Sequence, residues 1–241
     1  MKPTRIAMRR RTLHLPTLFG LLLIGLALAS PVRSQTIPSP YAFVDTRHEA
    51  TVFAGMTATD RGTLRLGPGG GPLIGIRYAF EITGPLAVEI LGSYMNSDRE
   101  VYDPRSETQP PQLLGTLTQH VILLEGRIRL NLTGARTWYR LAPYLHAGGG
   151  VATGATQRFA AEEDFGPGQQ FTFGPSATLS VGGGTRWIPL DRIGVRLEGG
   201  VNLWKVGTPP AFKAREELIG AVPDSEWPRW ATAVLGISYR F

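Results

Sequence analysis

The chain has 241 residues, no cysteine and a formal net charge of +6. The absence of cysteine excludes disulfide bonds, zinc–thiolate sites and a cysteine nucleophile. Six basic residues lie before residue 35, in a stretch without Asp or Glu, which leaves 25 − 6 = 19 basic residues against 19 acidic ones in the rest of the chain. A neutral remainder gives no basic surface for DNA or RNA, so no nucleic-acid partner is expected.

Residues 1–34 have the pattern of a secretory signal peptide, with a basic start, an apolar run over residues 18–28 and small residues at the end. That run is shorter than the roughly 20 apolar residues of a transmembrane helix, which disfavours a membrane anchor. Two cleavage positions fit, one after Ala29 and one after Ser34.

Residues 35–46 are expected to form a short extended periplasmic lead-in, and residues 47–241 a single barrel domain. This second part contains eight segments of strand character and no convincing helix. Strands of about 9 to 11 residues suffice to cross a bilayer when tilted, so the segment lengths are adequate. The predicted strands are 48–58, 72–82, 86–96, 118–132, 138–152, 176–188, 193–206 and 230–241.

Alternation with a period of two is clear in several of these segments. In 72–82, Ile76 and its apolar neighbours at every second position share one face, and Arg77 and Glu81 share the other. In 193–206 the face opposite the apolar residues carries Arg196 and Glu198. Successive side chains of a strand point to opposite faces, so each segment has one apolar and one charged face.

The connections between the predicted strands alternate strictly in length. Short turns fall near residues 83–85, 133–137 and 189–192, and long connections near 59–71, 97–117, 153–175 and 207–229. Short periplasmic turns and long external loops are typical of outer-membrane barrels. A soluble antiparallel barrel or sandwich, with its apolar face inward, also fits the alternation and is the alternative.

Aromatic residues near the predicted strand ends favour the membrane barrel, because such barrels carry aromatic girdles at both interfaces. The predicted interfacial aromatics are Phe80, Tyr94, Trp138, Trp187, Trp204 and Trp230. The last strand ends with Gly236, Tyr239 and the terminal Phe241 in the pattern Gly-x-x-Tyr-x-Phe. This ending resembles the C-terminal assembly signal of bacterial outer-membrane β-barrel proteins.

After residue 34 the whole chain resembles the small eight-stranded OmpA/OmpX-like outer-membrane barrels, with the run at residues 141–150 (LAPYLHAGGG) as the most similar segment besides the carboxyl terminus. The resemblance implies an all-β, eight-stranded antiparallel up-and-down transmembrane barrel in the outer membrane of a Gram-negative-type bacterium. It further implies a monomer that contacts outer-membrane lipid and lipopolysaccharide. During biogenesis, periplasmic chaperones and the barrel assembly machinery would be its partners.

Eight strands leave an interior only wide enough to be filled by the barrel's own side chains. We expect inward-facing polar residues to form a network of ion pairs that plugs the lumen, because buried charges are tolerated when paired. Across the short turns, Arg77 is predicted to reach Glu89, and Arg186 to reach Glu198. The predicted network consists of Arg77, Glu81, Glu89, Glu125, Arg127, Arg129, Tyr144, His146, Arg186, Arg196, Glu198 and Arg240.

The sequence predicts no catalytic centre, no cofactor and no metal site. A lipid hydrolase on the lipid-facing surface needs Ser, His and a carboxylate within reach of one another. His120 can face lipid, but no Ser lies two residues away, and His146 is expected to point inward. The acidic run 162–164 lacks the spacing of a calcium loop, and the glycine-rich stretch 67–71 lacks the Lys-Ser/Thr of a phosphate loop and is expected to be a flexible hairpin tip.

These observations predict a non-enzymatic outer-membrane barrel with a structural or surface-contact role that its four external loops would carry. The alternative is a narrow channel or a small-solute-binding barrel that uses the charged lumen. Loop-borne function diverges among proteins of one fold, so the sequence does not name a ligand.

Overall fold

The computed structural model of the chain describes residues 39–62, 65, 67–103, 105–106, 112–156, 166, 173–210 and 223–241. The predicted signal peptide, both cleavage positions and the acidic run 162–164 lie outside these residues. Residues 40–241 form one compact unit. Among the described residues, no helix is long and apolar enough to cross a membrane.

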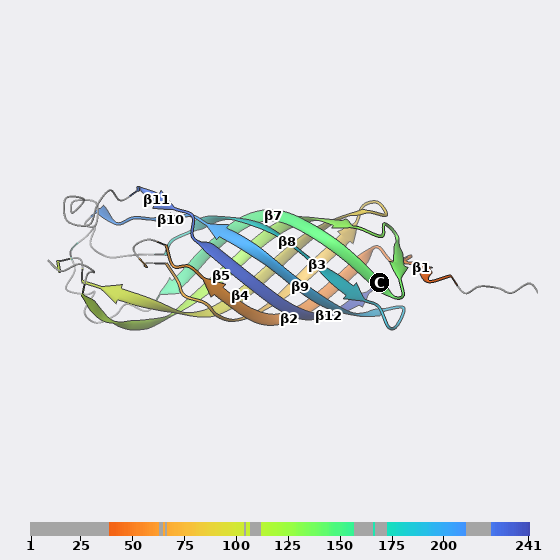
Figure 1. Ribbon diagram of the computed structural model, residues 1–241, viewed down its shortest axis with the longest axis horizontal. Helices are drawn as coiled ribbons and strands as arrows, with labels where there is room; N and C mark the ends of the chain where they lie inside the picture. The colour runs from red at the N-terminus through yellow and green to blue at the C-terminus, as the bar shows by residue number, and fades with distance from the viewer. Residues whose placement is uncertain are drawn as a thin grey trace, which may run out of the picture. The chain divides into compact units, whose positions relative to one another are not determined.

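Eight long strands in this unit form a closed antiparallel barrel (Figure 1). They are β2 (His48–Thr59), β3 (Gly71–Glu81), β4 (Leu86–Tyr102), β5 (Leu113–Asn131), β7 (Leu141–Thr156), β8 (Ser176–Trp187), β9 (Ile193–Trp204) and β12 (Arg229–Arg240). Around the barrel the order is β7-β5-β4-β3-β2-β12-β9-β8, and β8 pairs back with β7 to close it. The predicted all-β up-and-down barrel is confirmed.

The last strand closes the barrel against the first long strand. β12 pairs with β2 along almost its whole length, from Trp230 opposite Thr59 to Arg240 opposite Glu49. An open sheet would leave the backbone N–H and C=O groups of two edge strands unpaired. An even number of strands returns the chain to its starting end, so closure needs no crossover.

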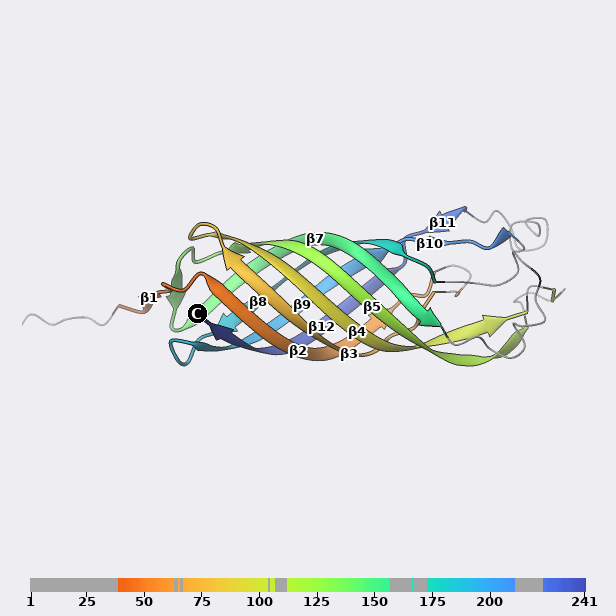
Figure 2. The same ribbon diagram turned by 180° about the vertical axis from the view of Figure 1, so that it is seen from behind.

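Two ends of the barrel differ in their connections (Figure 2). The short-turn end carries the tight connections, the carboxyl terminus, and β1 (Tyr41–Phe43), which pairs with β6 (Arg136–Trp138). At the other end, the long-loop end, β2, β4, β7 and β9 terminate and the small pair β10 (Val206–Gly207) and β11 (Ser225–Glu226) is found. Part of the predicted lead-in is therefore a strand.

β4 and β5 are longer than predicted. Their ladder continues past Asn96 opposite His120 as far as Tyr102 opposite Leu113, so the connection predicted at 97–117 is reduced to residues 103–112. The outward positions become polar beyond Tyr94, which interrupts the apolar alternation in the sequence. The backbone pairing does not depend on that alternation and persists.

The interior of the barrel has two layers. The short-turn half holds charged side chains, and the long-loop half holds an apolar cluster that the sequence analysis did not predict. The rings of Trp204 and Trp230 stack at 4.5 Å between centroids, and Phe173 meets Trp204 edge-on at 5.2 Å. The apolar cluster consists of Phe53, Leu73, Leu91, Met95, Val121, Leu123, Ala152, Phe173, Trp204, Val206, Trp230 and Val234.

Candidate functional site

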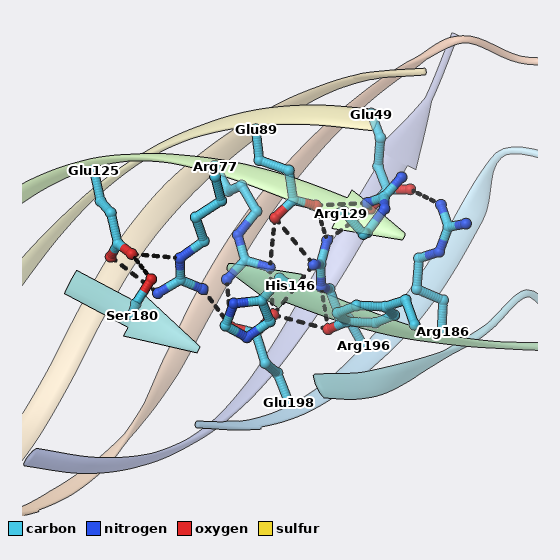
Figure 3. A network of polar contacts seen from close by, with 12 residues as sticks. Glu49, Arg77, Glu89, Glu125, Arg129, His146, Ser180, Arg186, Arg196 and Glu198 are labelled. Carbon is cyan, nitrogen blue, oxygen red and sulfur yellow. Dashed lines mark hydrogen bonds and ion pairs between the residues drawn. The ribbon is translucent and has the colours of Figure 1, made fainter. Parts of the chain in front are cut away.

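Charged side chains from most of the long strands meet in the short-turn half of the lumen (Figure 3). All are buried, and each guanidinium lies within 4 Å of at least one carboxylate. This lumen network contains five carboxylates and five guanidiniums among the described residues. They are Glu49, Glu81, Glu89, Glu125, Glu198, Arg77, Arg127, Arg129, Arg186 and Arg196.

Glu198 on β9 is the most connected acceptor of the lumen network. Arg77 on β3 donates to its two carboxylate oxygens from Nη1 at 2.7 Å and Nη2 at 3.0 Å. Arg127 on β5 donates from Nη1 at 2.7 Å, and the hydroxyl of Tyr144 on β7 donates at 2.8 Å. Hydrogen bonds to an ionised acceptor are shorter and stronger than neutral ones, and two-pronged Arg pairs also fix orientation. Glu198 therefore ties strands from different sides of the barrel together.

Glu89 on β4 is a second centre, closer to the short-turn end. It accepts from Arg129 Nη1 at 2.6 Å and from Arg196 at 2.9 and 3.2 Å. Arg77 Nη1 lies 3.6 Å from the Glu89 carboxylate. Arg196 also donates from Nε to the Tyr144 hydroxyl at 2.6 Å, and its guanidinium lies over that ring at 4.3 Å. Tyr144 thus joins the two carboxylate centres.

Arg186 on β8 was predicted to reach Glu198, but it contacts other acceptors instead. Its Nη1 donates to Glu49 at 2.8 Å and to Glu81 at 3.1 Å, and its Nη2 donates to Asn131 at 3.0 Å. In the sheet Arg186 stands directly opposite Arg196, another cation. Its side chain therefore finds its acceptors on β2, β3 and β5, across the lumen.

Glu125 and Arg127 pair within β5, on the side of the lumen network nearer the long-loop end. Arg127 Nε and Nη2 donate to the two oxygens of Glu125 at 2.9 and 3.0 Å. Ser180 on β8 donates its hydroxyl to the same carboxylate. Arg127 therefore bridges Glu125 to Glu198.

Eleven of the twelve predicted lumen residues lie in one connected cluster, counting His146, whose Nε2 is 3.6 Å from Glu198. The twelfth, Arg240, is also buried, but it donates to the hydroxyl of Thr46 at 2.6 Å rather than to a member of the cluster. Glu49 is a member of the cluster that was not predicted, because β2 has small or apolar residues on both faces and its phase is ambiguous in the sequence. Its acidic character was the only signal available.

Glycines on β8 leave the room that the two ring side chains of β7 need. A Cβ at Gly184 would lie 2.6 Å from the Tyr144 hydroxyl oxygen, and a Cβ at Gly182 would lie 2.6 Å from His146 Nε2. Real Cβ contacts are longer than this, so a larger residue would push either ring out of place. The glycine run at residues 182–184 therefore accommodates Tyr144 and His146 in the lumen.

The exterior of the barrel has the opposite character. Outward side chains at every second position are apolar and largely exposed, with Ile76 at 68%, Leu124 at 62% and Ile237 at 61%. A belt of this kind running around a barrel far exceeds the isolated apolar patches of soluble proteins. In lipid, a closed barrel with all backbone groups paired is one of only two structures that can span the bilayer.

The chain is a small eight-stranded outer-membrane β-barrel protein. The soluble-barrel alternative is wrong, because the apolar faces of the strands point outward and the charged faces point inward. In barrels of this kind the short turns face the periplasm and the long loops face outside. The closed barrel and its apolar exterior agree with the predicted location in the outer membrane.

The predicted interfacial aromatics divide into two groups. Phe80, Trp138 and Trp187 are exposed at the short-turn end, and Tyr94 is exposed toward the long-loop end. The prediction is wrong for Trp204 and Trp230, which are 0% and 2% exposed and belong to the apolar cluster inside the barrel. Trp204 shares the phase of the inward Glu198, and Trp230 that of the inward Arg240, so strand periodicity places both in the lumen.

The residues of the predicted assembly signal lie at the short-turn end of β12. Tyr239 and Phe241 are exposed on the lipid side and their rings lie 6.1 Å apart, while Gly236 faces the lumen. The ring of His48 stacks on Phe241 at 5.6 Å, and its Nδ1 is hydrogen-bonded to the hydroxyl of Tyr78 at 2.6 Å. Their recognition by the assembly machinery stays a prediction.

Beyond the apolar belt, the extension of β4 holds the first long loop. Glu100 pairs with Arg61 and accepts a hydrogen bond from the hydroxyl of Tyr102 at 2.5 Å. The hydrogen bond from Tyr102, with the guanidinium of Arg61, holds the pKa of Glu100 below its ordinary value of 4.5. Burial and the same hydrogen bond raise the pKa of Tyr102.

The glycine-rich stretch 67–71 of this loop was predicted to be a flexible hairpin tip, but hydrogen bonds hold it in place. Pro68 is fully buried, and Gly69 donates its N–H to the carbonyl of Asp98 at 2.7 Å. The hydroxyl of Ser97 donates to the carbonyl of Gly69, also at 2.7 Å. A Cβ at Gly69 would lie 2.6 Å from the Asp98 carbonyl, so glycine permits the close approach of the two backbones.

No protein-family model and no curated protein sequence matches the chain. Among solved structures it is similar to Neisserial surface protein A, at 14% identity over 84% of this chain and 98% of that one, with a TM-score of 0.48. It is similar to OprG from Pseudomonas aeruginosa at 12% identity over 81% and 97%, with a TM-score of 0.49. It is also similar to the outer membrane enzyme PagL at 13% identity over 79% and 97%, with a TM-score of 0.37. The identification above rests on strand pairing and the apolar exterior.

Proposed function

We propose that the protein is a non-enzymatic outer-membrane barrel with a plugged lumen and a structural or surface-contact role carried by its external loops. The observation that carries the proposal is the filling of the lumen in two layers, the lumen network in the short-turn half and the apolar cluster in the long-loop half. The space between the layers, next to Arg77, Glu198 and Trp230, is about 20 Å³. A water molecule needs roughly 10–15 Å³, so this gap has room for about one.

Single-channel recording in planar bilayers tests the plug. The refolded wild-type protein is expected to give no current steps at concentrations at which an open porin, as positive control, gives many. The reason is that an ion entering the lumen would have to displace side chains that are already paired to one another. Long-lived conducting steps would contradict the plug and favour the alternative, a narrow channel or small-solute-binding barrel that uses the charged lumen.

The non-enzymatic part of the proposal is supported by the partners of two histidines, because a lipid hydrolase needs Ser and a carboxylate within reach of a lipid-facing His. His120 lies on the outer face, where its Nδ1 is hydrogen-bonded to the Tyr94 hydroxyl at 2.6 Å and the rings stack at 5.6 Å. His146 is enclosed in the lumen. Mass spectra of lipid A from a Gram-negative host expressing the protein are expected to match those of the empty host. Loss of an acyl chain would establish an enzyme.

The surface-contact role is supported by how firmly the long-loop end is built. The β4–β5 hairpin extends beyond the apolar belt, and the first loop is attached to it through Glu100 and Asp98. Cells that display the wild-type protein are expected to adhere to a coated surface or to one another. Replacing residues 208–223 by a Gly-Ser linker is expected to reduce this adhesion. Equal adhesion of host cells without the protein would contradict the role.

The proposed partners follow from the same role. Lipopolysaccharide would surround the long-loop end, and periplasmic chaperones and the barrel assembly machinery would act before insertion. We propose a monomer, because each strand of the barrel finds both neighbours within one chain. Light scattering of the detergent-refolded protein at the mass of two chains would contradict this.

A further inference from the structure

The lipid-facing surface is not evenly filled. An apolar hollow of about 810 Å³ crosses the outer faces of β12, β2, β3 and β4 and reaches β9 at Ile193 and β5 at Leu124. Its sides are formed by large side chains such as Ile237 and Ile76, and the small residues Ala50 and Gly92 leave space between them. At Gly92 an added Cβ would have no atom within 4 Å, so the space in front of this residue is open. We call this hollow the lipid-side groove.

The groove ends at the short-turn end between two tyrosines. Tyr78 and Tyr239 stand on either side of Ala50 in the sheet, and both line the groove. The Tyr78 hydroxyl is bonded to His48 Nδ1 at 2.6 Å, and Arg192 Nη1 donates to the Tyr239 hydroxyl at 3.4 Å. Aromatic residues of this kind mark the level of the lipid headgroups.

The groups at this end favour a negatively charged headgroup. The side chain of Arg192 is exposed, as is that of Arg47, which precedes His48 at the start of β2. Asp45 and Asp191 are also exposed at this end, but among the described contacts of these four side chains only Arg192 is bonded to a residue that lines the groove. A guanidinium is well suited to phosphate, because its N–H groups match the phosphate oxygens in pairs. Positive charge near a membrane surface also attracts anionic lipids.

We propose that the lipid-side groove is a binding site for one anionic phospholipid of the periplasmic leaflet. One acyl chain lies in the groove over Ala50 and Gly92, and the phosphate lies between Arg192 and His48. Other parts of the barrel exterior contact lipid without holding it. Here a chain fills a space that would otherwise leave the groove side chains without contacts on one side.

Native mass spectrometry of the refolded full barrel with phosphatidylglycerol and, separately, phosphatidylcholine tests the proposal. The wild type is expected to retain one phosphatidylglycerol after the detergent is removed, and phosphatidylcholine less well. Gly92→Leu fills the groove and is expected to weaken retention roughly tenfold, the equivalent of 1.4 kcal/mol. Arg192→Gln is expected to reduce the preference for phosphatidylglycerol roughly fivefold.

Gly199→Leu is the matched control for the groove. Gly199 on β9 also faces lipid, and an added Cβ there would meet only the Thr232 carbonyl oxygen at 3.7 Å, but the residue does not line the groove. Equal loss of lipid in the two leucine variants would overturn the proposal, as would a wild type that retains no lipid or a graded series of lipids. The wild-type measurement decides the matter even where a variant fails to refold.

Discussion

Glu198→Gln is the substitution that tests the lumen network most sharply. The change keeps the size of the side chain and removes one of five negative charges that face five guanidiniums. At about 4 Å and an effective dielectric constant near 20, each lost charge pair is worth about 4 kcal/mol. The carboxylate's own desolvation cost, several kcal/mol, is recovered, and measured losses on breaking buried pairs are about 3–5 kcal/mol. We expect a loss in this range.

The assay is guanidinium chloride unfolding of the barrel in lipid vesicles, followed by tryptophan fluorescence. Glu100→Gln is the control, because Glu100 makes its ion pair with Arg61 outside the apolar belt. Exposed pairs contribute about 0.2–1 kcal/mol, so the control is expected to lose no more than that. A loss below about 1 kcal/mol for Glu198→Gln would show that the guanidiniums do not depend on its charge and would refute the reasoning.

Three further predictions concern other parts of the barrel. Tyr144→Phe removes two hydrogen bonds to charged partners and is expected to lower the free energy of unfolding by about 1.5–3 kcal/mol in the same assay. Trp230→Ala opens the apolar cluster and is expected to cost about 3–5 kcal/mol, whereas Trp138→Ala, exposed on the lipid side, is expected to cost clearly less; equal losses would contradict the inward placement. Because the folded-state pKa of Glu100 is lowered, its contribution to holding the first loop is present above pH 4.5 and is lost as the pH falls through the lowered value. Protease cleavage of that loop is therefore expected to increase only below pH 4.5, and Glu100→Gln is expected to remove the pH dependence.

The strands were predictable because a membrane barrel imposes a two-residue period on both of its faces. Charged residues such as Arg77 and Glu198 alternate with apolar residues along their strands, which indicates which face points inward. The same period places Trp230 in phase with inward residues such as Arg240, although Trp230 was predicted to lie at the membrane interface. The ends of β4 and β5 were not predictable in this way, because polar outward residues at Asn96 and beyond are compatible with either a loop or a strand.

The partners in the lumen network were much harder to predict than its members. A pair across a short turn, such as Arg77 and Glu89, follows from local register, and these groups lie 3.6 Å apart. The shorter contact of Arg77 is to Glu198, 121 residues further along the chain. Such contacts depend on how far the strands are staggered when the barrel closes, and this stagger is a property of the whole sheet. The pairing of Arg186 with Glu49 belongs to the same class.

The central claim is that the chain forms a closed barrel whose apolar face meets lipid. Gel mobility in SDS of residues 35–241, refolded into detergent, tests it directly. A closed membrane barrel resists unheated SDS, so the heated and unheated samples are expected to migrate differently. Identical migration, together with good solubility in the absence of detergent, would contradict the account and would mean that the apolar face encloses the interior.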